Sequence, residues 1–229
     1  MSKSVNSKYI MITGIIGLVA AVLVGVGEFL LHFDPLARFS ETSYEFMLAT
    51  SDKQQTLGHF FGALGAPLYV VGCWHIYLML KQANQKLAFL GFIVSAYGFI
   101  IGAEWISSRA SIGAITHLQE TGVNLDGLVE LYQLRYENLL TIIRITTVIL
   151  SGIFIYLTLT GRSHYQKWQG IFSPIVLLLL SFVVYLIKPS AGKYLMPIAL
   201  NIGFGLFFIM SLLQARNISQ VNSHSQEKL

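Results

Sequence analysis

Three ionisable side chains lie inside long apolar runs of this chain: Glu28, Glu104 and Arg144. An ionisable group in hydrocarbon costs enough free energy that it marks a functional site by default. An arginine beside two glutamates would neutralise part of their charge and hold them in place. These three residues are therefore the first candidates for a ligand-binding site, although they do not by themselves name a reaction.

The composition places these charges in a membrane protein. Hydrophobic residues make up 54% of the 229 residues and charged residues only 11%. So little polar material predicts one membrane domain and excludes a large enzymatic head. The basic residues lie at the ends of apolar segments, a pattern typical of membrane topology and not of a nucleic-acid surface. Cys73 is the only cysteine, which excludes an intrachain disulfide and a Cys-based zinc site.

The apolar runs predict an all-α fold, a six-helix transmembrane bundle at 1–215 followed by a disordered cytoplasmic tail at 216–229. The first run has no small-residue cleavage site and is expected to stay as a signal anchor. Lys and Arg favour the side that holds the termini and two short turns, eight against six, which predicts that both termini are cytoplasmic. The predicted spans are Tyr9–Phe33, Leu57–Leu80, Leu87–Ser107, Leu139–Thr160, Ile171–Ile187 and Tyr194–Leu213.

The outer connections are longer than the inner ones. Residues 34–56 mix aromatic and acidic side chains, which predicts a short interfacial helix. Residues 108–138 continue the third span, turn at the sequence GVNLDG and lead into the fourth span. We therefore expect two helices, rich in acidic residues, to project beyond the bilayer on the outer side.

Helix geometry places the charged residues at a similar depth. At about 1.5 Å per residue, Glu28 lies roughly 28 Å from the inner end of its span, and Glu104 and Arg144 lie roughly 25 Å from theirs. His59 falls near the outer mouth by the same count. All four side chains are expected in the outer leaflet, but equal depth does not establish contact.

Helix facing gives a second line of argument. Glu28 continues a stripe of small residues in the first span, and such stripes mark the face where membrane helices pack. Glu104 lies off the equivalent stripe of the third span by about 160 degrees of rotation. Arg144 shares a polar face with Glu137, seven residues earlier, a separation that we expect to be too long for a direct pair. Asn201 is expected to form the floor of a cavity. The stripe in the first span comprises Gly14, Gly17, Ala21 and Gly25.

The order of several segments resembles an uncharacterised family of small bacterial six-span integral membrane proteins. The segments are GEFLLHFDP, GALGAPLYVVGCWHIYLMLK, SPIVLLLLSFVVYLIKP and NIGFGLFFIMSL. Shared features are Gly27 with Glu28, an aromatic residue before His75, and Asn201 in the last span. Where the family pattern has a histidine near the end of span three, this chain has Glu104 followed by Trp105. The resemblance implies a location in the bacterial inner membrane and no particular activity.

These observations favour an outward-facing polar pocket that binds a small amphipathic molecule or membrane lipid, which the protein would then transport or sense. The ligand-binding candidates are Glu28, His59, Glu104, Arg144 and Asn201, with no cofactor and no nucleic-acid partner. Homo-oligomerisation stays open. The competing explanation for Glu28, Glu104 and Arg144 is a structural charge cluster that fixes the register of the helices.

Two other classes of function stay open. An intramembrane enzyme would hydrolyse lipid with a metal held by His32, His59 and Glu28, because Glu28 and His32 are one turn apart. The sequence has no HExxH pattern to support that site, so metal ligation ranks low. A non-catalytic membrane subunit would recognise a partner through the acidic outer helices. For His75, an interfacial hydrogen-bonded histidine is the favoured interpretation.

Overall fold

The computed structural model describes residues 7–38 and 44–226, with side chains described up to residue 218. Helices make up nearly all of this part, and it contains no strand. The helices are α1 (Ser7–His32), η1 (Glu45–Ala49), α2 (Asp52–Leu80), α3 (Gln85–Glu120), α4 (Asp126–Leu159), η2 (Lys167–Phe172), α5 (Pro174–Ile187), α6 (Pro189–Leu195), η3 (Met196–Ile198) and α7 (Ala199–Gln226).

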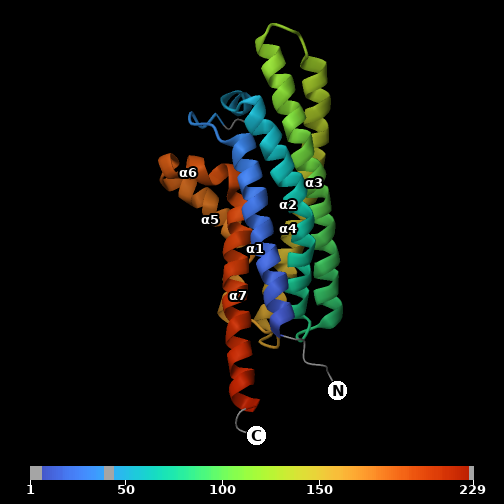
Figure 1. Ribbon diagram of the computed structural model, residues 1–229, viewed down its shortest axis with the longest axis vertical. Coiled ribbons are helices and arrows are strands. Elements are labelled where there is room, and N and C mark those ends of the chain that lie inside the picture. The colour runs from blue at the N-terminus through green and yellow to red at the C-terminus, as the bar shows by residue number, and fades with distance from the viewer. Residues whose placement is uncertain (1–6, 39–43, 227–229) are drawn as a thin grey trace.

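Five stretches in the described residues are long and apolar enough to cross a membrane: α1, α2, α3, α4 and the continuous run from α6 through α7. The chain is therefore a helical membrane protein, as the composition predicts. The predicted fifth span corresponds to α5, which has 14 residues. A perpendicular crossing needs about 20 residues, so α5 alone does not reach across the hydrocarbon. In Figure 1 the start of α1 and the end of α7 lie at the same end of the bundle.

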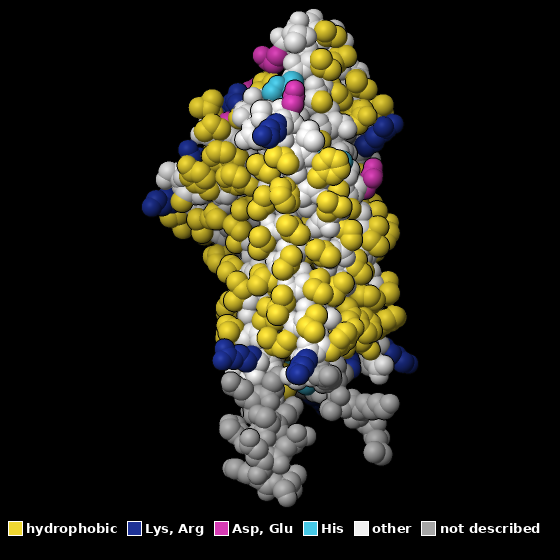
Figure 2. Space-filling view, in the orientation of Figure 1, with side chains coloured by type: hydrophobic (Ala, Val, Ile, Leu, Met, Phe, Trp, Pro, Cys, Tyr) yellow, Lys and Arg dark blue, Asp and Glu magenta, His cyan; other side chains and the backbone are white. Residues whose placement is uncertain are grey.

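The surface supports the same arrangement. Figure 2 shows hydrophobic side chains covering the middle of the molecule, with Lys and Arg gathered at the end where α1 begins and charges of both signs towards the other end. A belt of this kind is expected where lipid tails surround the bundle. The predicted tail at 216–229 overlaps the end of α7, which is helical to Gln226, and residues 227–229 lie outside the described part.

The two projecting helices are present. Helices α3 and α4 extend past the rest of the bundle and are joined by a short turn (Figure 1). Gly122 in this turn has φ of +85°, a left-handed conformation that glycine adopts without steric cost. The predicted interfacial helix in 34–56 is the short 3-10 helix η1, while residues 39–43 lie outside the described part.

Glycines bring α1 very close to its neighbours. A Cβ atom added to Gly27 would lie 2.7 Å from the carbonyl oxygen of Gly58 and the backbone nitrogen of Gly62 in α2. A Cβ atom on Gly17 would lie 2.9 Å from the Cα of Gly72 and closer still to the Phe208 ring of α7. The small-residue stripe of α1 therefore packs against α2 and α7, and Glu28 at its end lies inside the bundle.

Candidate functional site

The buried charge pair of the structure joins Glu28 of α1 to Arg109 of α3. Glu28 Oε1 lies 3.7 Å from Arg109 Nη1. Glu28 is 6% exposed and Arg109 is 6% exposed, so both charges are shielded from bulk water. Two opposite charges at this separation and depth stabilise one another strongly, because the surroundings screen them weakly.

Helix α7 completes the environment of the carboxylate. The Asn201 side-chain amide donates a hydrogen bond of 2.6 Å to Glu28 Oε2. The hydroxyl of Tyr69 on α2 donates in turn to Asn201 Oδ1 at 2.7 Å. Asn201 thus accepts from Tyr69 and donates to Glu28, so the orientation of its amide is fixed from both ends.

Arg109 is held by aromatic residues on its other side. Arg109 Nη2 donates a hydrogen bond of 3.0 Å to the hydroxyl of Tyr136 on α4. The guanidinium carbon lies 3.5 Å from the centroid of the Trp105 ring, close enough for a strong cation–π contact. Nε and Nη1 of Arg109 are buried and have no hydrogen-bond partner. Two nitrogens of this guanidinium therefore lack a hydrogen-bond acceptor within the protein.

A cavity of about 240 Å³ adjoins this polar cluster. One end is lined by Glu28, His32, Arg109 and Tyr136, and Arg144 also lines it. The walls are apolar and come mainly from α4, α5 and the region around η3. Helix α5 packs chiefly against α7 and contacts α4 less, which leaves space between α4 and α5. The apolar wall residues include Leu140, Ile143, Val148, Ile175, Leu178 and Phe182.

A second, smaller cavity of about 40 Å³ lies inside the bundle. Glu28 and Trp105 line both cavities, while Tyr69, Ser95 and Thr146 line the smaller one. A volume of this size accommodates a few water molecules, and its lining offers them polar partners. Glu28 thus lines both a small, mainly apolar chamber and a larger cavity whose lining includes several charged side chains.

Two of the predicted charged residues do not join the buried pair. Glu104 is exposed on the outside of α3, in keeping with its position off the packing stripe. Arg144 pairs with Glu137 at 3.8 Å, so the expectation that seven residues are too many for a direct pair was wrong. Their long side chains cover the roughly 10 Å between the two positions along the helix. Both are exposed, and such surface pairs contribute little to stability.

The predicted histidines lie apart from one another. His32 is 4% exposed, and its Nε2 has no hydrogen-bond partner. Its ring makes edge contacts with Phe46 and Trp105. His59 packs against Phe60 and is partly exposed. Within the described ranges, no three His, Cys, Asp or Glu side chains are grouped closely enough to hold a metal ion, which weighs against the metal-dependent alternative.

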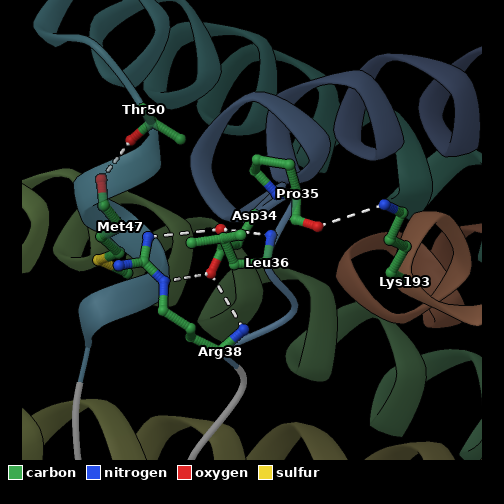
Figure 3. A network of polar contacts seen from close by, with 7 residues as sticks. All are labelled: Asp34, Pro35, Leu36, Arg38, Met47, Thr50 and Lys193. Carbon is green, nitrogen blue, oxygen red and sulfur yellow. Dashed lines mark hydrogen bonds and ion pairs between the residues drawn. The ribbon is translucent and has the colours of Figure 1, made fainter. Parts of the chain in front are cut away.

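A polar network fixes the segment that follows α1 (Figure 3). Asp34 accepts hydrogen bonds from the backbone N–H groups of Leu36 and Arg38, and from Arg38 Nε at 2.8 Å. Lys193 donates to the carbonyl of Pro35 and so joins this loop to α6. Burial alone would raise the pKa of Asp34, but the hydrogen bonds from Arg38 and the backbone outweigh it and lower that pKa.

His75 has a separate role deeper in the bundle. It is fully buried, and its Nδ1 lies 2.9 Å from the Ile10 carbonyl. A carbonyl only accepts, so Nδ1 carries the proton and Nε2 accepts from the Ser211 hydroxyl at 2.6 Å. Tyr165 donates to the same hydroxyl at 2.6 Å. This network joins α1, α2 and α7 and is fully occupied by protein partners.

The sequence did not point to Arg109, Tyr69 or Tyr136. Arg109 follows the predicted end of the third span at Ser107 and was counted with the outer loops. Because α3 continues to Glu120, Arg109 lies inside a long helix one turn after Trp105. The spacing of Trp105 and Arg109 on one helical face, beside other apolar residues, is the signal that would have identified it.

Comparison with known proteins gives one match. A model described as a family of unknown function (DUF6796) covers residues 1–217, nearly the whole chain. No curated protein and no solved structure matches the chain.

Proposed function

The chain belongs to the DUF6796 family of unknown function, and we propose that it binds a small amphipathic molecule or lipid in the cavity between α4 and α5. The observation that carries the proposal is the combination of a buried arginine with unpaired donors and apolar walls in one cavity. A ligand with a polar head and an apolar chain matches both parts. The bound molecule would then be transported or sensed.

The position of the cavity supports entry from the membrane. Val148 and Phe182 line it and are 54% and 42% exposed on the outside of the bundle. Pockets for small ligands commonly have volumes of about 300–1,000 Å³, so a cavity of about 240 Å³ holds the head and the first part of a chain. The remainder of the chain would lie between α4 and α5 in contact with bilayer lipid.

Our proposal includes six crossings of the bacterial inner membrane, with both termini in the cytoplasm. The fifth crossing uses η2 and α5 together, because α5 alone is short. The bias of Lys and Arg and the common end of α1 and α7 support this topology. A membrane-impermeant maleimide should label Asn124→Cys in intact cells and Gln82→Cys only after lysis. The reverse pattern would invert the topology, and Cys73 is buried and gives little background.

Ligand binding can be tested by native mass spectrometry of gently extracted protein. The wild-type protein should retain adducts of lipid or amphiphile mass. Val148→Trp fills the mouth of the cavity and should lower the occupancy of these adducts several-fold. Ile145→Trp is the matched control, because Ile145 is 53% exposed on the same helix and does not line the cavity. Equal occupancy in the two variants would overturn the proposal.

A further inference from the structure

We infer that the amphiphile bound in this cavity carries an oxyanion headgroup, a carboxylate or a phosphate, which Arg109 binds. This inference rests on the proposed function and specifies its ligand class. The cavity already holds one carboxylate, Glu28, so the headgroup would be a second anion beside the same guanidinium. The sign of the headgroup charge follows from two features: the N–H groups of Arg109 without an acceptor and the other polar groups that line the cavity.

Arg109 has more donors than the protein uses. A guanidinium carries five N–H donors and no hydrogen-bond acceptor. Each N–H group that the protein leaves unpaired therefore needs an acceptor from another molecule. The Tyr136 hydroxyl accepts a hydrogen bond from Nη2. The Glu28 carboxylate, 3.7 Å from Nη1, is beyond hydrogen-bond distance. Nε and Nη1 are buried without a hydrogen-bond partner. Leaving buried donors unpaired is costly, and a bidentate oxyanion satisfies two N–H groups of one arginine at once.

The other polar groups at this end also favour a negative headgroup. Arg144 lines the cavity and is 64% exposed, so it is able to meet a headgroup as it enters. His32 lines the same end and has an unpaired buried Nε2. The charged residues that line the cavity are therefore two arginines and one glutamate. Glu137, the partner of Arg144, does not line it.

The apolar walls complete the recognition. Ile175, Leu178 and Phe182 from α5 face Leu140 and Val148 from α4 across the cavity. None of these residues offers a polar group to a second head or to a sugar. A cavity lined by both charged and apolar side chains fits a molecule that has a charged head and an apolar chain.

The test compares ligands that differ only in the headgroup. Protein in phosphatidylcholine nanodiscs is titrated with tritiated palmitate, hexadecyl phosphate and hexadecanol, and binding is read by scintillation proximity. Val148→Trp protein gives the background from the bilayer. We expect palmitate, hexadecyl phosphate or both to bind at least about tenfold more tightly than hexadecanol, because a charge-assisted bond of Arg109 is lost with the alcohol. The anion that binds more tightly identifies the headgroup.

Two sets of variants locate the selectivity. The double variant Glu28→Gln, Arg109→Gln keeps the buried pair neutral and should lower the preference for the anions over hexadecanol to no more than the contribution of Arg144. Arg144→Gln should weaken binding of the anions about three- to tenfold without changing hexadecanol. Arg135→Gln removes the same charge from an exposed position of α4 outside the cavity and should change nothing. If the double variant fails to fold, the comparison of the three probes on the wild-type protein still decides whether the headgroup is an oxyanion.

The possible failures are distinguishable. Equal binding of all three probes to the wild-type protein, above the Val148→Trp background, would overturn the oxyanion headgroup and leave the amphiphile pocket intact. Binding no higher than that background for every probe would overturn the proposed function itself. Equal effects of Arg144→Gln and Arg135→Gln would contradict recognition at the mouth of the cavity.

Discussion

Removing both members of the Glu28–Arg109 pair should destabilise the protein less than the sum of the two single removals. At 3.7 Å and an effective dielectric constant of about 20, the attraction is about 4 kcal/mol. Breaking a buried pair typically costs about 3–5 kcal/mol, because one charge stays buried and uncompensated. We expect Arg109→Gln to be the more harmful single change, since it also removes the contacts with Trp105 and Tyr136. Glu28→Gln keeps an oxygen that accepts from Asn201.

The assay is thermal unfolding in one detergent at one scan rate, combined with unfolding in increasing sodium dodecyl sulfate. For a chain of this size, 1 kcal/mol corresponds to about 2–4 °C, so each single variant should lower the midpoint by roughly 6–20 °C. The double variant Glu28→Gln, Arg109→Gln should lose less stability than the sum of the two single losses. The difference, which is the coupling energy, should be about 2–3 kcal/mol.

An exposed pair in the same molecule provides the control. The Glu137–Arg144 pair has a similar separation of 3.8 Å, but its side chains are 48% and 64% exposed. The same double-mutant cycle there should give less than about 1 kcal/mol. Additive losses at Glu28 and Arg109, or equal coupling in the two pairs, would refute the argument that burial makes the first pair strong.

Three further changes test the packing and the polar networks. Gly27→Ala should destabilise the protein by about 1–3 kcal/mol in thermal unfolding, because the new Cβ would meet the backbone of α2. Gly102→Ala is the control: its Cβ would have nothing within 4 Å, so the change should be neutral or stabilising. Ser211→Ala should cost about 1–3 kcal/mol, since it leaves two buried partners unpaired; a loss below 0.5 kcal/mol would contradict this. The pKa of Asp34 is lowered in the folded protein, so its stabilisation is complete above the unfolded value of about 4 and disappears as the pH falls through the folded value. The difference in midpoint between wild type and Asp34→Asn should therefore shrink between pH 6 and pH 3.

The helical membrane fold follows from local properties of the sequence, which is why its prediction agrees with the structure. Long apolar runs specify helices, because the backbone in hydrocarbon must satisfy its hydrogen bonds internally. The run that was predicted as Tyr194–Leu213 is more complex, since α6 ends at Leu195 and α7 begins at Ala199. Pro197 between them lacks an N–H group and so interrupts the α-helical hydrogen bonds. Hydropathy alone does not register this interruption.

The site could be predicted only in part. Glu28 and Asn201 were identified because their own helices show which face is buried, and helical periodicity is a local signal. The partner of Glu28 was not, because depth arithmetic compares heights and does not say which helices are neighbours. Arg109 and Arg144 are on different helices at the outer end, and only the packing of α1 against α3 and α7 selects between them.

The same geometry separates a ligand site from a charge cluster that only fixes the helix register. A structural pair in hydrocarbon is expected to use all its donors, because every unpaired group lowers the stability that the pair provides. Here Asn201 and Tyr136 supply part of the hydrogen bonding, and two donors of Arg109 stay unpaired beside a cavity. If those donors await an anion, a saturating oxyanion amphiphile should raise the thermal midpoint of the wild-type protein by several degrees and leave the Val148→Trp variant unchanged. A structural cluster would give the same small response in both proteins.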